Sequence, residues 1–321
     1  MATMFTLSFQ STFLAAFQIL LMGGCGYLLT RRKVINEEGL GLLSGLVIHF
    51  FLPCFILSQF LGNFSFQLYK NWWVFPLLSF AMTLCAFLLA KAVCLFEKDI
   101  THRKEFLALV SFQNSGYIPL MLVATLFSIE GARILNVYIF LFLIGFDLIL
   151  WLLGVWMLTR HRIEKFELKN MVSSPVVAIA ASLLLVFLGA PRFIPPEVMK
   201  PLKMFGDCTL PLAMIIMGGN LARFKMRDVH IPEIFLLVMT KLVLLPLLAL
   251  SVVMIFKMDF WVGFLIVLEA AAPSAVSLSV IARHYKIEEA FINQGLFFTY
   301  LFSVLTIPVF LMMYSNLLGS F

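Results

Sequence analysis

The chain has 321 residues, of which 62% are hydrophobic and 12% are charged, and its net charge is +6. A soluble domain carries about 25% charged residues and about half apolar ones, so this composition, with a mean hydropathy of +1.02, predicts an integral membrane protein. Soluble enzymes, nucleic-acid binders and disordered scaffolds are excluded, because the basic residues are spread over short loops and form no patch with interleaved aromatics.

Ten stretches are apolar enough to cross a bilayer, which takes about 20 residues per helix. In chain order they are 9–29, 39–61, 71–96, 106–128, 134–158, 171–190, 204–222, 231–256, 260–282 and 290–314. One set of alternate loops carries 15 Lys and Arg residues and the other set carries six; Lys91 and Lys241, inside spans, complete the 23. Because basic residues favour cytoplasmic loops, this bias predicts that both termini lie outside the cytoplasm.

The two halves of the chain carry related motifs at one constant offset of 158 positions. The matches include Leu52-Pro53 with Leu210-Pro211, and Ile129-Glu130-Gly131-Ala132 with Ile287-Glu288-Glu289-Ala290. This pattern predicts two five-helix repeats, 1–158 and 171–321, joined by a cytoplasmic connector at 159–170. Because five is odd, the second repeat enters the membrane upside down, which is the inverted-repeat design of secondary transporters.

The fourth and ninth spans contain polar residues and a proline within otherwise apolar sequence, at 111–119 and 269–277. Proline removes a backbone donor and clashes with the preceding turn, so both helices are expected to kink or unwind there. Freed peptide groups at membrane depth are tolerated only beside protein or water. If the two breaks cross near the midplane, their half-helix N-termini favour a bound anion. The alternative is two plain proline kinks whose small residues serve packing.

The candidate substrate-binding residues therefore come from these two segments. They are Gln113, Asn114, Ser115, Gly116, Pro119, Pro273, Ser274 and Ser277.

Four stretches of the chain carry a family resemblance. They are Gly26-Tyr27-Leu28-Leu29 followed by Leu52-Pro53; Asn114-Ser115-Gly116-Tyr117-Ile118-Pro119-Leu120; Leu210-Pro211 through Gly218-Gly219-Asn220-Leu221; and Ala272-Pro273-Ser274 through Ile281-Ala282-Arg283-His284-Tyr285. On these motifs the whole chain resembles the auxin efflux carrier family, which includes bacterial malonate-transporter-like proteins and lies within the bile acid/arsenite/riboflavin transporter superfamily.

This resemblance implies an all-α membrane fold of ten helices, with a scaffold domain, a core domain and crossover helices at the fourth and ninth spans. It also implies small organic anions as substrates, contacted by Asn114 and its neighbours. The long cytoplasmic loop of the plant hormone carriers is replaced here by the short connector, which argues against that specialised branch.

Charged residues inside spans are costly unless they are paired, hydrated or protonated. Asp147 could carry a proton or cation, or form a structural pair with Lys241. Glu269 could bind sodium together with unwound carbonyls and the hydroxyls of Ser274 and Ser277, and it resembles an acidic sodium ligand of bile-acid-type relatives; a protonated Glu269 bonded to the backbone is the alternative. Lys241 could serve as counter-ion for either acid or meet a substrate carboxylate.

Other polar residues are weaker candidates. Ser111 is grouped with Glu269 and Asp147 for ion coupling. His49 and Asp207 lie four residues before Pro53 and Pro211. Packing is the favoured interpretation of His49 over a proton shuttle, and exposure near the outer end is the favoured one of Asp207. Asn220 could cap a helix or bind substrate. The five cysteines form no CxxC pair, and no nucleotide-binding, HExxH or metal-spaced His/Cys motif is present. No cofactor or metal is expected beyond Na⁺ or H⁺ as coupling ion.

These features together predict a secondary transporter, a symporter or antiporter, that moves a small mono- or dicarboxylate by alternating access, coupled to H⁺ or Na⁺. It would reside as a multi-pass protein in the lipid bilayer of a plasma or bacterial inner membrane, and a homodimer through the scaffold helices is compatible with the pattern. The alternative is a transporter-like sensor or binding module without net flux. An enzyme and a nucleic-acid partner are not expected.

Overall fold

A computed structural model describes residues 9–97, 100–159, 174–222, 229–285, 287 and 290–318. Within these residues the fold is all-helical, without a β-strand. The first half comprises α1 (Phe9–Arg31), α2 (Glu37–Leu46), η1 (Val47–Phe51), α3 (Leu52–Asn63), α4 (Val74–Phe96), α5 (Arg103–Ser111), α6 (Tyr117–Leu126), α7 (Ile129–Ile149), η2 (Leu150–Gly154) and α8 (Val155–Thr159). The second comprises α9 (Ser174–Phe187), η4 (Ala190–Arg192), α10 (Pro196–Asp207), α11 (Thr209–Ala222), α12 (Ile231–Met239), η5 (Thr240–Leu244), α13 (Leu245–Ile255), α14 (Phe260–Ala271), α15 (Ser277–His284) and α16 (Ala290–Leu318).

Seven helices in the described part of the chain are long and apolar enough to cross a membrane. They are Phe9–Arg31, Glu37–Asn63, Val74–Phe96, Ile129–Thr159, Pro196–Ala222, Ile231–Ile255 and Ala290–Leu317. The remaining three predicted spans correspond to shorter helices: α9 lies within 171–190, α5 and α6 overlap 106–128, and α14 and α15 overlap 260–282. The chain is therefore a multi-pass membrane protein. Most of the predicted connector at 159–170, and several of the basic loop residues, lie outside the described residues.

Two of the long helices contain a π-helical turn just before a proline. The turn η1 ends one residue before Leu52-Pro53, and η5 ends just before Leu245-Pro246. Proline has no N–H and clashes with the carbonyl of the preceding turn. A π-turn shifts the hydrogen-bond ladder to i→i+5 locally, so the helix continues through the proline without ending. This explains why the helices continue through Pro53 and Pro246. The motif Leu210-Pro211 instead lies at the start of α11, after a turn at Cys208 that separates it from α10.

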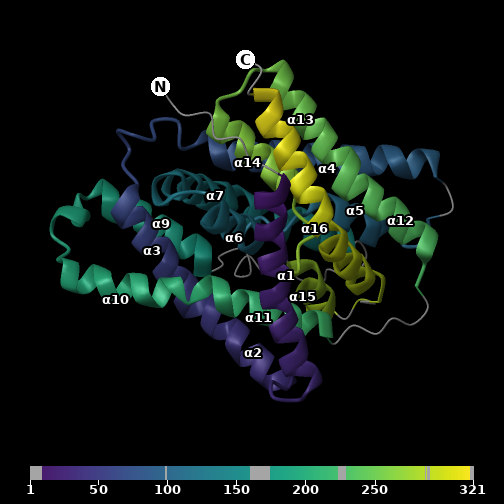
Figure 1. The fold of residues 1–321 in the computed structure, drawn as a ribbon, viewed down its shortest axis with the longest axis horizontal. Coiled ribbons are helices and arrows are strands. Elements are labelled where there is room, and N and C mark those ends of the chain that lie inside the picture. Colours follow the sequence, from purple (N-terminus) through teal and green to yellow (C-terminus); the bar gives the residue numbers. More distant parts are fainter. Residues whose placement is uncertain are drawn as a thin grey trace.

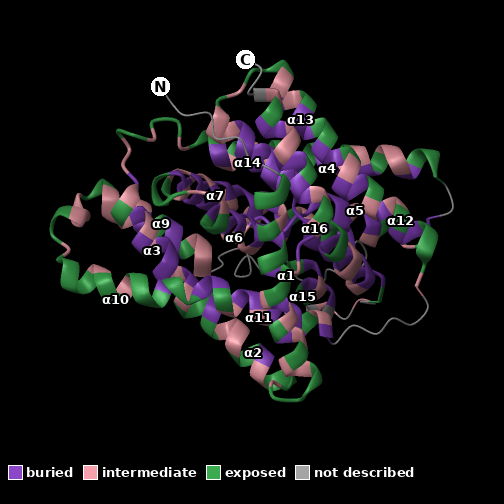
Figure 2. Ribbon diagram, viewed as in Figure 1, coloured by how far each residue is buried: buried purple, intermediate pink, exposed green. Residues whose placement is uncertain are grey.

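The exposed surface of the outer helices is apolar, as expected where lipid replaces water. Leu21 is 54% exposed, Leu42 64% and Leu77 56%. Figure 2 shows that buried residues concentrate in the middle of the molecule, around α5, α6, α7 and α14, whereas α2 and α10 carry many exposed residues. Large exposed apolar side chains on a soluble protein would form aggregation-prone patches. Here they form a surface suited to hydrocarbon.

Close helix contacts hold the centre together. The helix α1 packs against α11, α16 and α6 (Figure 1). A Cβ atom on Gly218 of α11 would overlap the carbonyl oxygen of Gly23 on α1, and one on Gly26 would overlap that of Ile215. Small residues permit such backbone approach, which drives helix association in membranes. At one side of the view in Figure 1, α3 packs against α9 and α10.

Candidate functional site

The first helix break separates α5 from α6. The helix α5 ends at Ser111, and Phe112 then adopts an extended conformation with φ −111° and ψ 115°. The helix α6 begins at Tyr117, with Gly116 at its N-cap. Pro119 lies in the first turn of α6, where backbone N–H groups have no partner within the helix and proline is tolerated. Residues 112–116 thus form a non-helical segment between two short helices, extended at Phe112 and bent at Gly116.

The second break separates α14 from α15. The helix α14 ends at Ala271, and Ala272 is extended with φ −65° and ψ 143°. Pro273 follows directly, and the residue before a proline is disfavoured in the helical region. The helix α15 begins at Ser277. Both stretches identified in the sequence by their proline and polar content are therefore interrupted helices.

The two breaks are hydrogen-bonded to each other. Gln113 and Ser274 form an isolated antiparallel bridge. The N–H of Asn114 donates to the carbonyl oxygen of Pro273 at 2.7 Å, and the N–H of Ala275 donates to that of Phe112 at 2.9 Å. Unwound backbone in a membrane needs such partners, because hydrocarbon supplies none. Each break thus satisfies peptide groups that the other exposes, and the two segments meet at one point.

Side chains around the bridge fix its geometry. The hydroxyl of Ser274 donates to the carbonyl oxygen of Leu109 at 2.7 Å, and its N–H donates to the hydroxyl of Thr299 at 3.4 Å. The side-chain amide of Asn114 donates to the hydroxyl of Tyr300, and its oxygen accepts from the N–H of Tyr117 at 3.2 Å. These bonds hold the Asn114 amide in one orientation between α6 and α16.

A buried acid and a buried lysine lie beside the bridge. Glu269 and Lys241 are both fully buried, and they interact electrostatically. The ammonium group of Lys241 donates to the carbonyl oxygen of Val110 at 3.0 Å. Of the two acids considered as its partner, Glu269 is thus the one that interacts with Lys241, without a hydrogen bond between them.

Several buried polar atoms next to Glu269 have no hydrogen-bond partner among the described residues. They are both carboxyl oxygens of Glu269, Nε2 of Gln113 and the hydroxyl oxygen of Ser115. The side chains of Gln113 and Ser115 nevertheless lie within reach of the Glu269 carboxyl group as hydrogen-bond donors, although none of these contacts has full hydrogen-bond geometry. Buried polar groups are normally satisfied, so an unsatisfied acid, amide and hydroxyl at one place are the features of a site that receives a ligand, ion or proton.

An apolar cavity of about 340 Å³ lies next to the bridge. It is lined by α1, α6, α11 and α16 and opens to the surface, with Ile19, Gly23, Ile118, Met217, Gly218, Phe297, Tyr300 and Val304 among its lining residues. Tyr300 belongs both to the cavity wall and to the hydrogen bond with Asn114. The cavity therefore connects, through one phenol group, to the polar atoms of the first break.

The remaining predicted site residues lie at varied distances from this centre. The hydroxyl of Ser111 is buried and donates to the carbonyl oxygen of Leu107 in its own helix at 2.7 Å. Asp147, on α7, is half-buried and interacts with Tyr117. Ser277 is exposed at the start of α15.

Three weaker candidates do not join the two breaks. His49 is exposed and its Nδ1 lies 2.6 Å from the hydroxyl oxygen of Ser174 on α9. Asp207 and Asn220 are exposed on α10 and α11. The equivalent positions of His49 and Asp207 in the two repeats therefore do not bring these residues together at the bridge.

Sequence reasoning missed Thr299 and Tyr300, which both contact the bridge. They stand in the apolar stretch of α16 with no proline, glycine or charge beside them. The only local signal is a pair of hydroxyl-bearing residues within a long hydrophobic helix, and such pairs commonly bond to their own helix. Tyr117 lies in the motif at 114–120, but nothing in that motif distinguishes it as a contact residue.

A comparison with known proteins matches the chain to a protein family. Residues 11–174 and 158–311 match a family model described as "Membrane transport protein". An uncharacterized transporter of Methanocaldococcus jannaschii is 25% identical over 304 residues, which cover 91% of this chain and 95% of that protein. An uncharacterized transporter of Schizosaccharomyces pombe is 30% identical over 105 residues, 32% of this chain. The match spans only 23% of the length of the Schizosaccharomyces pombe protein.

Proposed function

Since the chain belongs to the membrane transport protein family, we propose that it is a secondary transporter that moves a small organic anion by alternating access. The observation that carries this proposal is the bridge between Gln113 and Ser274, where two broken helices meet beside the unpartnered Glu269. Discontinuous helices that meet inside the protein are the usual location of substrate and coupling-ion sites in secondary transporters.

Helix bounds support the inverted repeat on which alternating access rests. Shifted by 158 positions, residues 37–63, 74–96 and 103–111 become 195–221, 232–254 and 261–269, against observed helices at 196–222, 231–255 and 260–271. The contacts between the two halves are equivalent as well. The helix α1 of the first half packs against α11 of the second, and α9, the equivalent of α1, packs against α3 of the first. Two halves with equivalent packing can exchange conformations, which opens one site first to one side of the membrane and then to the other. By the bias of Lys and Arg in the loops, both termini lie outside the cytoplasm.

An anionic substrate is favoured by the donors at the bridge. The helices α6 and α15 both begin at the breaks, so their free N–H groups and positive dipole ends lie near the same point. Nε2 of Gln113 is an unused donor, and Nζ of Lys241 is a further donor nearby. We assign substrate contacts to Gln113, Asn114, Ser115, Gly116 and Pro119 on one break and to Pro273, Ser274 and Ser277 on the other.

Coupling to H⁺ or Na⁺ is assigned to Glu269. A buried carboxyl group without a hydrogen-bond partner is costly when charged. Binding of a proton or a sodium ion removes that cost, so occupancy of Glu269 changes the stability of the state in which it is buried. Asp147 and Ser111 are secondary candidates for the same role, and Asp147 acts through its proximity to Tyr117.

Flux measurements in proteoliposomes test the site. We expect Asn114→Ala and Glu269→Gln each to lower the flux of a mono- or dicarboxylate at least tenfold, because removal of one preorganised electrostatic group commonly costs that much or more. Asn71→Ala and Glu130→Gln serve as matched controls, since both residues are exposed. If both test variants transport at the wild-type rate, the site is wrong.

Binding measurements on the detergent-purified protein separate the transporter from a sensor. A ligand that binds the folded state raises its apparent stability, so thermal unfolding is followed with a panel of carboxylates, each with Na⁺ or K⁺ at two pH values. A shift that needs both an anion and Na⁺ supports a sodium site. An anion shift that is larger at low pH and independent of Na⁺ supports proton coupling. Binding without net flux in liposomes would support a sensor or binding module instead.

A further inference from the structure

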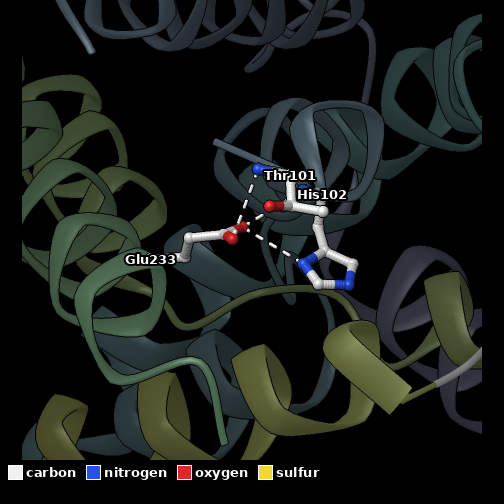
Figure 3. A network of polar contacts seen from close by, with 3 residues as sticks. All are labelled: Thr101, His102 and Glu233. Carbon is white, nitrogen blue, oxygen red and sulfur yellow. Dashed lines mark hydrogen bonds and ion pairs between the residues drawn. The ribbon is translucent and has the colours of Figure 1, made fainter. Parts of the chain in front are cut away.

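A second polar cluster lies away from the two breaks, where the start of α12 approaches the start of α5. It contains His102, His230 and Glu233, of which Glu233 is buried, His102 half-buried and His230 exposed. One ligand atom from each side chain lies within 4.8 Å of the other two. Figure 3 shows the Glu233 carboxyl group directed from α12 towards Thr101 and His102.

Backbone and ring contacts hold the cluster in place. The carboxyl oxygens of Glu233 accept the N–H groups of Thr101 at 3.3 Å and His102 at 3.1 Å. Nδ1 of His102 lies 3.2 Å from the same carboxylate. The imidazole of His102 stacks on Phe291 of α16 with a centroid distance of 4.5 Å and 2° between the planes. Glu233 and His102 are therefore preorganised by three helices, α5, α12 and α16.

The third side chain, that of His230, has no comparable structural role. The ring of His230 lies 4.6 Å from the ring of His102, centroid to centroid. It precedes α12 at the N-cap without a side-chain capping bond. A purely structural account in which Glu233 caps α5 and pairs with His102 leaves His230 without a role.

We propose that His102, His230 and Glu233 form a binding site for a divalent transition-metal ion of the zinc type. Two imidazoles and one carboxylate are a donor set that Zn²⁺ accepts, with a water completing the fourth position. Ligand atoms about 2.1 Å from a tetrahedral ion lie about 3.4 Å apart. Atoms already within 4.8 Å of one another need only a small movement to reach this spacing, which the exposed His230 can supply, and the same side chain leaves a path from solvent.

The backbone contacts of Glu233 also fit this assignment. A ligating carboxylate is itself normally hydrogen-bonded, which fixes its orientation, and the Glu233 oxygens accept from the N–H groups of Thr101 and His102. A bound ion would connect the start of α12 with the start of α5, the helix that leads into the first break. The inference does not depend on the proposed transport function, so either one can fail without the other.

Titration of the full-length protein with Zn²⁺ tests the site. The protein is purified in detergent without a histidine tag and treated with a chelator, and binding is measured by calorimetry and by the visible absorption of added Co²⁺. We expect one ion per chain. We expect His230→Ala and His102→Ala each to weaken binding at least tenfold, because even outer-shell changes cost 10- to 100-fold in affinity.

The control variant is His49→Ala, which removes an exposed histidine from η1, far from the cluster in sequence. Its Zn²⁺ affinity is expected to equal that of the wild type. His230→Ala removes only a ring contact, so its elution as a folded monodisperse protein is a direct check on folding. Absence of wild-type binding, or equal affinity in the wild type and His230→Ala, would overturn the proposal.

Discussion

The contact between α1 and α11 makes a sharp prediction about Gly218. In Gly218→Ala the new methyl group would overlap the carbonyl oxygen of Gly23 and lie 2.9 Å from its Cα atom. Carbon atoms in contact normally lie about 3.5–4.0 Å apart. Because the obstructing atoms belong to the backbone of α1, no side-chain rotation can relieve the overlap. The two helices must therefore move apart.

The magnitude follows from two opposing effects. Overpacking costs about 1–3 kcal/mol, and a clash with rigid backbone belongs at the upper end of that range. Replacing a helical glycine by alanine gains about 0.5–1 kcal/mol. We therefore expect Gly218→Ala to lower the free energy of unfolding by about 2 kcal/mol. Gly24→Ala, on the same cavity wall but with no atom within 4 Å of the new methyl group, is expected to raise it by about 0.5–1 kcal/mol.

Thermal unfolding in detergent, followed by the loss of monodisperse protein on a sizing column, compares the two variants. A difference of about 3 kcal/mol corresponds to roughly 6–12 °C, at 2–4 °C per kcal/mol. The cavity lies between the same helices, so Gly218→Ala should also reduce ligand-induced stabilisation, whereas Gly24→Ala should leave it nearly intact. Equal midpoints for the two variants would refute the close approach of α1 and α11.

Two further predictions concern the polar centre. Lys241→Met is expected to destabilise the protein by about 1–3 kcal/mol in thermal unfolding, because the carbonyl of Val110 loses its donor and Glu269 loses its positive neighbour. Adding Glu269→Gln to Lys241→Met should recover part of the loss, and strict additivity in this double-mutant cycle would contradict the coupling. Tyr300→Phe removes the phenol bonded to Asn114, so the apparent affinity for a transported anion should fall roughly two- to tenfold, the equivalent of about 0.5–1.5 kcal/mol; an unchanged affinity in liposome flux assays would separate Tyr300 from the site.

Much of the helical framework was predictable because hydropathy and proline act locally. The span predicted at 231–256 corresponds to α12 through α13 at 231–255, and the one at 9–29 to α1 at 9–31. Hydropathy misses helix ends where polar residues extend a helix beyond its apolar part. An example is the first turn of α2, which contains Glu37 and Glu38 and is capped by Asn36. The π-turns before Pro53 and Pro246 were not predicted, because the Leu-Pro motif alone does not distinguish a π-turn from a kink.

The site was predictable in its location but not in its partners. The breaks at 112–116 and 272–276 have clear composition signals, yet the bond from Lys241 to Val110 joins residues 131 positions apart. The same separation divides His102 from Glu233, so no short spacing motif indicated a cluster there. Such contacts depend on how helices pack, and a single sequence carries no direct record of packing.

The pairing of the two breaks has a consequence for biogenesis. Phe112 and Asn114 are synthesised long before Pro273 and Ala275, the residues that complete their hydrogen bonds. At about 5–20 residues per second, the ribosome takes roughly 8–30 s to make the intervening chain. During that interval the first half holds peptide groups for which hydrocarbon offers no partner. A polypeptide ending after α8 is therefore expected to remain a substrate for membrane proteases, and co-expression of the second half as a separate polypeptide is expected to protect it.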